Sequence, residues 1–358
     1  MSLAANFDLH ARACAQLGSP LYAALLPEVA DDVAAGGPCA AALAGYEDAE
    51  RDAAIPLRFL AAVHALALSG AAPELAAYYP STNPHAEPQP NGRVWAAFRR
   101  VVADHPEWIR DWLTRPPQTN EVGRTVPLLA GLLAAVDATP LPIRLLELGS
   151  SAGLNLRADH FRWAAGDLAW GPEGSPVTID HAWRGPVPDW LRAAVARHPR
   201  VEIIERRGCD PNPLDPCSSR DALALRAYIW PDQPGRLARL DGALRLAREV
   251  PVTIERTSAR DFLAGIEPLP GTLTIVWHSV MRQYVPEDEW RAVTAELDRL
   301  AAADPPFAYI AFEPEHSVDD RDGFLLTARL GTTPTALLAR AIPHGIPAFL
   351  PSAPLVQQ

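Results

Sequence analysis

The sequence contains no lysine, and all 32 of its basic residues are arginines. This absence excludes a lysine Schiff base, with or without pyridoxal phosphate. It also excludes the phosphate-binding P-loop, whose lysine contacts the phosphates of the nucleotide. The absence of lysine therefore excludes both of these kinds of site.

Cysteine is scarce as well, and the four cysteines form no metal-ligand pattern. They show no Cys-x-x-Cys pair and no neighbouring histidine at zinc-ligand spacing. The histidines are scattered, and no His-Glu-x-x-His motif is present. We therefore expect no metal and reduced, packed thiols at Cys14, Cys39, Cys209 and Cys217.

Long apolar runs and basic clusters are also missing. No stretch approaches the roughly 20 apolar residues of a membrane span, and the N-terminus lacks the layout of a signal peptide. We expect a cytoplasmic location and no membrane. The formal net charge is −11, without a basic cluster that could neutralise phosphates, so nucleic acid is not expected as a partner. A small molecule or a protein is the expected partner. Nothing in the sequence indicates the oligomeric state.

The length is sufficient for two domains, and the sequence pattern changes near residue 140. Residues 1–140 are predicted to form a helical N-terminal cap domain. Residues 141–358 alternate short apolar strands with helices, which predicts an α/β domain with a mostly parallel sheet and an inserted hairpin at 163–188. Strands are expected near 143–148, 201–206, 251–256, 272–278 and 307–313, helices near 153–161, 220–227, 234–249 and 286–303, and a final antiparallel ribbon from 324–330 and 336–341.

The most informative stretch is RLLELGSSAGLNL, residues 144–156. An apolar run ends in an acidic residue, a turn punctuated by glycines follows, and a helical pattern begins. Small residues let a ligand approach the backbone, and unpaired amides at a helix N-terminus favour anionic or polar ligand atoms. The candidate cofactor-binding residues here are Glu147, Gly149, Ser150, Ser151, Gly153 and Asn155.

Two chemistries compete for this turn, and a third can be set aside. The dinucleotide motif G-x-G-x-x-G fails, because only Gly149 and Gly153 are present at that spacing. The string GSSAG satisfies G-x-S-x-G, the nucleophile elbow of α/β-hydrolases, with Ser151 as nucleophile. The segment before it is helical rather than strand-rich, so the usual hydrolase scaffold is missing. The remaining interpretation is the first motif of class I S-adenosylmethionine methyltransferases, which Glu147 favours as the acid that closes the first strand.

A carboxylate after the second strand could accept the ribose hydroxyls of a nucleoside cofactor. Asp210 is the candidate and Asp215 the fallback, although Asp-Pro-Asn-Pro is also ordinary turn chemistry. After the third strand, Ser258 stands where an adenine contact is expected, with Asp261 one turn later. These two residues equally suit a helix N-cap.

Polar residues also follow the fourth and fifth predicted strands. His278 is the candidate general base and Tyr284 a group that could orient the acceptor. A hydrogen-bonded structural role for His278 is the alternative. Glu313, Glu315 and His316 would form a second polar cluster, which could attract amines or could simply be solvated.

The polar segment 118–124 lies between two predicted helices, just before the first strand. Glu121 is expected to start the second of these helices, with Asn120 as its cap. Arg124 could bind the carboxylate of a methionine moiety in bidentate fashion. An ion pair between domains is the alternative.

Several motifs together resemble one bacterial family, the domain of unknown function 2332. They are QTNEVGR, LLELGSSAGLNL, RRGCDPNPLDP, YIWPDQPGRLARLDGAL and IVWHSVMRQY, and the resemblance covers nearly the whole chain. The family is similar to class I methyltransferases, which implies a Rossmann-like sheet and an S-adenosylmethionine site but no particular substrate. The chain departs from the family after the third strand, where Thr257, Ser258 and Ala259 replace Gly-Asp-Ala, and this weakens the adenine assignment.

The expected function is therefore methyl transfer from S-adenosylmethionine to a small molecule or protein. Two alternatives stay open, a serine hydrolase that uses Ser151 and a non-catalytic binding module with the same fold. The segment 230–233, Trp-Pro-Asp-Gln, is left unexplained by this plan. It could line a substrate site or fasten the helical domain to the sheet.

Overall fold

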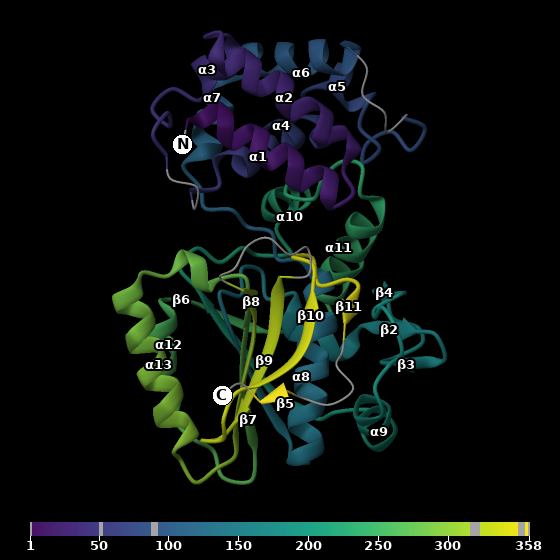
Figure 1. Cartoon of the computed structure of the whole chain (residues 1–358), viewed down its shortest axis with the longest axis vertical. Helices are drawn as coiled ribbons and strands as arrows, with labels where there is room; N and C mark the ends of the chain where they lie inside the picture. The colour runs from purple at the N-terminus through teal and green to yellow at the C-terminus, as the bar shows by residue number, and fades with distance from the viewer. Residues whose placement is uncertain (1, 50–52, 87–91, 316–322, 350–354, 357–358) are drawn as a thin grey trace. The chain divides into compact units, whose positions relative to one another are not determined.

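The computed structural model describes residues 2–49, 53–86, 92–315, 323–349 and 355–356. The chain forms two compact units (Figure 1). The first comprises residues 1–119 and 218–238, and the second comprises residues 120–217 and 239–358. The chain thus passes between the units three times, at 119/120, 217/218 and 238/239.

The first unit is helical and has one apolar core. Its central helix, Ile55–Leu68, is buried along nearly its whole length, as its continuous apolar sequence requires. The buried His64 ring lies in this core, with Nδ1 3.1 Å from the Ala227 carbonyl oxygen and Nε2 2.8 Å from Ser81 Oγ. The helices are α1 (Leu3–Gln16), α2 (Pro20–Ala34), α3 (Pro38–Ala42), α4 (Ile55–Leu68), α5 (Pro73–Ala76), α6 (Gly92–Asp104), α7 (Pro106–Leu113) and α10 (Ser219–Ala227).

Residues 230–233 join the later segment of this unit to the N-terminal helices. The Asp232 carboxylate accepts hydrogen bonds from Ser19 Oγ at 2.6 Å and from the Leu21 amide at 2.9 Å, which caps the start of α2. The Gln233 side chain donates to the Leu17 carbonyl at the end of α1, at 2.8 Å. Trp230 is buried in the same core. The role of this segment within the unit is therefore to fasten the helices together.

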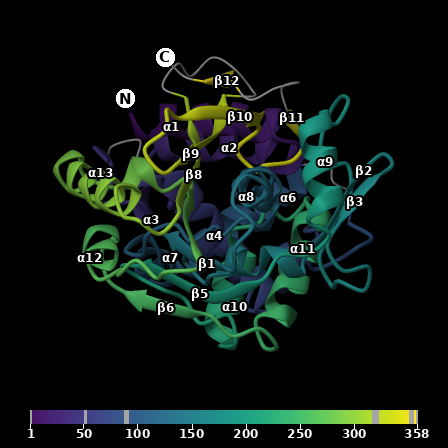
Figure 2. The same ribbon diagram turned by 90° about the horizontal axis from the view of Figure 1, so that it is seen from below.

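The second unit is built on a mostly parallel sheet (Figures 1 and 2). Its strand order is β11-β10-β9-β8-β7-β1-β5-β6, and β12 pairs with β10. Five strands are parallel, in the order third, second, first, fourth and fifth along the chain, which is the doubly wound pattern. The strands are β1 (Ile143–Leu148), β5 (Ile203–Asp210), β6 (Thr253–Arg256), β7 (Leu273–Ser279), β8 (Phe307–Pro314), β9 (Phe324–Leu330), β10 (Ala336–Ala341), β11 (Ala348–Phe349) and β12 (Leu355–Val356).

Helices cover both faces of this sheet (Figure 2). One face packs on α12 (Ala259–Ala264) and α13 (Glu287–Ala301) through Leu146, Leu148 and Val276. The other face packs on α8 (Thr125–Ala138), where the close approach of Gly131 to Ile310 leaves no room for a Cβ atom. Although α8 precedes residue 140, it belongs to the second unit. The structure also contains α9 (Asp189–Arg197), α11 (Pro234–Leu246), which runs from the first unit into the second, and the short 3₁₀ helices η2 (Val122–Arg124), η3 (Asn155–His160) and η4 (Arg282–Tyr284).

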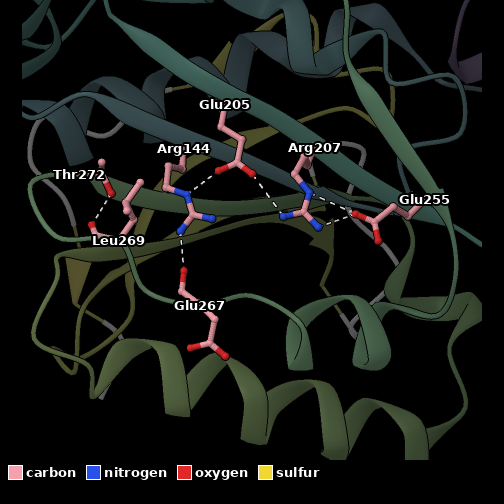
Figure 3. A network of polar contacts seen from close by, with 7 residues as sticks. All are labelled: Arg144, Glu205, Arg207, Glu255, Glu267, Leu269 and Thr272. Atoms are coloured by element: carbon pink, nitrogen blue, oxygen red, sulfur yellow. Dashed lines mark hydrogen bonds and ion pairs between the residues drawn. The ribbon is translucent and has the colours of Figure 1, made fainter.

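Part of the face below α12 is charged rather than apolar. Arg144 of β1, Glu205 and Arg207 of β5, and Glu255 of β6 form a continuous row of ion pairs (Figure 3). Arg144 also donates to the Glu267 carbonyl at 2.7 Å. Each charge in the row has an opposite neighbour, so these half-buried groups are satisfied and stabilise the register of the outer strands.

Most predicted elements are confirmed. The mostly parallel sheet, the antiparallel ribbon of β9 and β10, and the helices at 219–227 and 287–301 all form. The insertion contains a small sheet of β2 (Arg162–Ala165), β3 (Leu168–Trp170) and β4 (Thr178–Ile179). The helix predicted at 153–161 is wrong, since only the 3₁₀ helix η3 forms there and Arg157 within it has non-helical dihedrals. No helix among the described residues is long and apolar enough to cross a bilayer.

The role of Asp232 gives a first prediction. Asp232→Ala removes both hydrogen bonds at the start of α2 and should lower the free energy of unfolding by about 1–3 kcal/mol. Urea denaturation measures the change. Glu28→Ala, on an exposed position of the same helix, is the control and should cost less than about 0.5 kcal/mol. Equal effects of the two substitutions would contradict the role given to Asp232.

Candidate functional site

The candidate site lies where the strand order of the sheet reverses. β1 pairs with β5 on one side and with β7 on the other, and all three run in the same direction. Their carboxyl ends bring Leu148 beside Cys209 and His278. In doubly wound sheets, ligands bind at this switch point. The turn that follows β1 is therefore placed where a ligand site is expected.

Small residues are required in this turn for conformation and for space. Gly149 and Gly153 have φ of 66° and 63°, in the left-handed region. A Cβ atom on Gly149 would lie 2.9 Å from the Cβ atom of Met281, and one on Gly153 would lie 2.7 Å from Ile254 Cδ1. Neighbouring side chains thus pack directly against the turn.

The amides of the turn are satisfied by the protein itself. Ser150 N donates to the Cys209 carbonyl at 3.0 Å, and Gly153 N donates to the Ser150 carbonyl at 2.7 Å. Ser151 N donates to Asp210 Oδ2 at 2.9 Å, and Leu154 N donates to Asn120 Oδ1 at 3.2 Å. The expectation of unpaired amides at a helix N-terminus is therefore wrong for these four groups. The short η3 helix also lacks the length that gives an α-helix its dipole.

What the turn offers instead is hydrogen-bond acceptors. Glu147, at the end of β1, is only 2% exposed, and its Oε2 atom is buried without a hydrogen-bond partner. Asn155 Oδ1 is also buried without a partner, while the Asn155 side chain hydrogen-bonds to the Glu147 carboxyl group. A buried acceptor without a partner costs about 1–3 kcal/mol, so a donor placed here would be favoured.

Burial has the largest effect on the ionisation of Glu147. Burial raises the pKa of the Glu147 carboxyl group well above 4.5, and the nearby Asp210 raises it further, while Asn155 and the Arg157 guanidinium lower it. Arg157 donates to the Gly153 carbonyl at 2.8 Å and to the Val250 carbonyl at 2.7 Å, which fixes it beneath the turn. Sequence reasoning missed Arg157, because its role depends on the chain returning at residue 250.

Asp210 lies directly against the turn. Its second oxygen accepts from the Asn212 amide at 2.8 Å, and the residue is 8% exposed. A carboxylate accepts about four hydrogen bonds, so two such bonds leave capacity for others. Asp215, the fallback, accepts from the Cys217 amide at 2.9 Å. Both residues therefore support turns, as the alternative interpretation suggested.

The other predicted contacts have local partners. Ser258 is the N-cap of α12, and its side chain accepts from the Asp261 amide. Arg124 Nε donates to the Pro343 carbonyl at 3.0 Å. The assignment of Asn120 as a helix cap is wrong, since Glu121 caps η2 by accepting from the Gly123 amide at 3.0 Å, and Asn120 holds the turn after β1 instead.

His278 is enclosed by partners on the opposite face of the sheet. It is 1% exposed, with Nδ1 2.6 Å from Glu313 Oε1 and Nε2 2.6 Å from the Tyr309 hydroxyl. Because side chains alternate along a strand, His278 and the neighbouring Val276 point toward α13, whereas Glu147 points toward α8. This geometry favours the structural interpretation of His278 over a general base.

The remaining rim residues are dispersed. Tyr284 is 48% exposed. Glu315 forms an ion pair with Arg340 at 2.9 Å, and His316 lies outside the described residues. Glu313 also accepts from the Met281 amide at 3.0 Å, so it holds the residue that packs on Gly149.

Strained backbone gathers around the turn. Asn120, Ser151 and Val280 have φ of 34°, 53° and 53°, an uncommon conformation for residues other than glycine and a costly one for a β-branched valine. Such strain concentrates at ligand and catalytic sites. Among the described residues, no group of three or more metal-ligating side chains comes together.

The buried Glu147 predicts a pH dependence of stability. Because its pKa is raised in the folded state, the unfolded state loses this proton first, and stability falls as pH rises from about 4.5. Glu147→Gln should therefore be as stable as the wild type near pH 4 and more stable by about 1–3 kcal/mol at pH 8. Urea denaturation between these pH values measures the difference.

The control is Glu267→Gln, the same substitution at an exposed position, which should follow the wild type throughout. A wild type that gains stability over Glu147→Gln as pH rises would contradict the assignment.

The comparisons with known proteins agree with the family suggested by the motifs. A family model described as "Uncharacterized protein conserved in bacteria (DUF2332)" matches residues 4–349. No curated protein matches the chain. Since the family model covers nearly all of the sequence, including both units and the turn after β1, the chain belongs to this bacterial family.

Proposed function

We propose that the turn after β1 binds S-adenosylmethionine and that the protein is a methyltransferase acting on a small molecule or protein. The observation that carries the proposal is the bonding of the turn. Its amides of Ser150, Ser151, Gly153 and Leu154 are consumed internally, while Glu147 Oε2 remains an unpartnered buried acceptor. A turn with bonded amides and a free acceptor favours a ligand that brings hydrogen-bond donors and positive charge.

S-adenosylmethionine has these properties. It carries an ammonium group, a sulfonium and two ribose hydroxyls, whereas a dinucleotide presents a pyrophosphate that needs free amides. Glu147 and Asn155 would accept from the ammonium group, and Asp210 would accept from a ribose hydroxyl. A cation beside Glu147 would also favour its ionised form, which burial opposes.

The demands of the reaction match what the chain supplies. The cofactor, when bound, supplies an already activated methyl group, so the protein's contribution is positioning and exclusion of water. The turn and its neighbours Met281 and Ile254 are tightly packed, which suits that contribution. Because both His278 ring nitrogens have partners, no general base is assigned to that residue.

A serine hydrolase is the second candidate, and one observation favours it. Ser151 has φ of 53°, and the nucleophile of a G-x-S-x-G elbow also sits on a strained turn. Against it, the nearest strand-end histidine, His278, is bonded to Glu313 and Tyr309. A hydrolase would be labelled by a fluorophosphonate at Ser151 and would lose the label in Ser151→Ala. A non-catalytic module would bind the cofactor without turnover on any acceptor.

The central test is calorimetric titration with S-adenosylhomocysteine. We expect binding to the wild type, and a dissociation constant raised about tenfold or more in Glu147→Gln and in Asp210→Asn, the loss of one charge-assisted hydrogen bond. At one hundred times the dissociation constant, the ligand should also stabilise the protein by about 2.7 kcal/mol.

Two controls sharpen the test. Ser175→Ala removes a hydrogen bond to the His160 carbonyl, in the insertion, and should leave the affinity within twofold. NADH, which carries a pyrophosphate, should not compete. Absence of S-adenosylhomocysteine binding, or tighter binding of NADH, would overturn the proposal.

A further inference from the structure

The turn after β1 is supported from one side by a residue that belongs to neither adjoining strand. Asn120 Oδ1 accepts from the Leu154 amide at 3.2 Å, in a buried environment. Asn120 itself is 9% exposed and holds φ of 34°. A residue with a strained backbone whose side chain satisfies one amide of the turn indicates a structural demand for that amide's orientation.

The segment that carries Asn120 rests on a loop near the end of the chain. Arg124 Nε donates to the Pro343 carbonyl at 3.0 Å. A Cβ atom on Gly123 would lie 2.4 Å from the His344 carbonyl oxygen, and one on Gly345 would lie 2.5 Å from the Gly123 carbonyl oxygen. Backbone therefore meets backbone here, and only glycine permits the approach.

The helix that follows is equally fixed. Thr125 Oγ1 donates to the Val122 carbonyl at 2.7 Å and is fully buried. The segment 120–125 cannot shift without breaking these contacts or moving α8. The loop 343–346 thus sets the position of the segment, and the segment sets the position of Asn120.

We propose that Asn120 is a positioning residue for the ligand-binding turn, and that the loop 343–346 is the support that fixes it. The inference rests on the proposed function for its consequence, because the ligand is S-adenosylmethionine in that account. The Asn120 contact occupies the Leu154 amide, so this donor is not available to a ligand. The turn is thereby held in the form that presents Glu147 and Asn155.

Two substitutions remove the support at different places. Asn120→Gly deletes the acceptor and relieves the positive φ, so strain is not added. Gly345→Ala acts at the distant loop, where a Cβ atom would meet the Gly123 carbonyl oxygen and Arg124 Cα. The control for Asn120→Gly is His181→Gly, at an exposed residue with φ of 53°. The control for Gly345→Ala is Gly271→Ala, at a glycine with φ of 76° where an added Cβ atom would have no atom within 4 Å.

The first readout is amide hydrogen exchange without ligand. In both test variants, peptides covering 149–156 should exchange at least about tenfold faster than in the wild type, while peptides of β7 stay unchanged. The control variants should exchange as the wild type does. Unchanged exchange of the turn in Asn120→Gly would overturn the proposal.

The second readout is the dissociation constant for S-adenosylhomocysteine. Each test variant should have a dissociation constant at least about tenfold higher than the wild type. The double variant should have a dissociation constant no higher than that of the single variant with the lower affinity, because the two residues act through one support. Independent, additive losses would overturn the shared support. If the wild type binds no S-adenosylhomocysteine, the proposed function fails, and the exchange readout alone decides the role of Asn120.

Discussion

The turn after β1 depends on one constraint, which is that its amides must be satisfied within a buried environment. The Ser151 amide donates to the Asp210 carboxylate and the Leu154 amide donates to Asn120, so groups from two distant segments converge on the turn. A buried amide without a partner is costly, and these bonds remove that cost. These hydrogen bonds also determine which groups of the turn remain without a partner. Acceptors remain at Glu147 and Asn155.

This arrangement distinguishes the turn from a phosphate-binding loop of similar sequence. In such a loop the amides point at an anion. Here the carboxyl groups of Glu147 and Asp210 lie at the turn, and burial raises the pKa of Glu147, so a positive charge beside it would favour its ionised form. The turn therefore favours a ligand that brings hydrogen-bond donors over an anion that needs free amides, and this links the backbone geometry to the proposed cofactor.

The two faces of the sheet divide the predicted polar residues. Glu147 and Asn155 belong to the face toward α8, whereas His278 lies on the face toward α13, bonded to both Tyr309 and Glu313. Glu313 connects the two regions, because it holds the amide of Met281 and Met281 packs on Gly149. His278 is therefore connected through Glu313 to Met281, which packs against the turn.

Local patterns in the sequence were enough to predict most of the sheet. The parallel strands, the ribbon of β9 and β10, and the position of the turn at the end of β1 all follow from apolar runs and glycine spacing. The bonding of the turn could not be predicted in this way. Asn120 has the local sequence of a helix cap. Only the folded chain shows that its side chain accepts a hydrogen bond from the Leu154 amide instead.

The burial of His278 could have been inferred from strand alternation. Since Val276 belongs to the apolar face, the residue two positions later shares that face. The role of Arg157 depends on its bond to the Val250 carbonyl, and that residue lies 93 positions further along the chain, where no local pattern indicates the contact.

The central claim is that acceptor groups of the turn after β1 bind the ammonium group of the cofactor. A crystal structure of the protein with S-adenosylhomocysteine tests it most directly. The account predicts the ligand's ammonium group within hydrogen-bond distance of Glu147, with the bonds from Ser151 N to Asp210 and from Leu154 N to Asn120 intact. A ligand bound elsewhere, or a turn whose amides leave these partners to hold an anionic group, would contradict it.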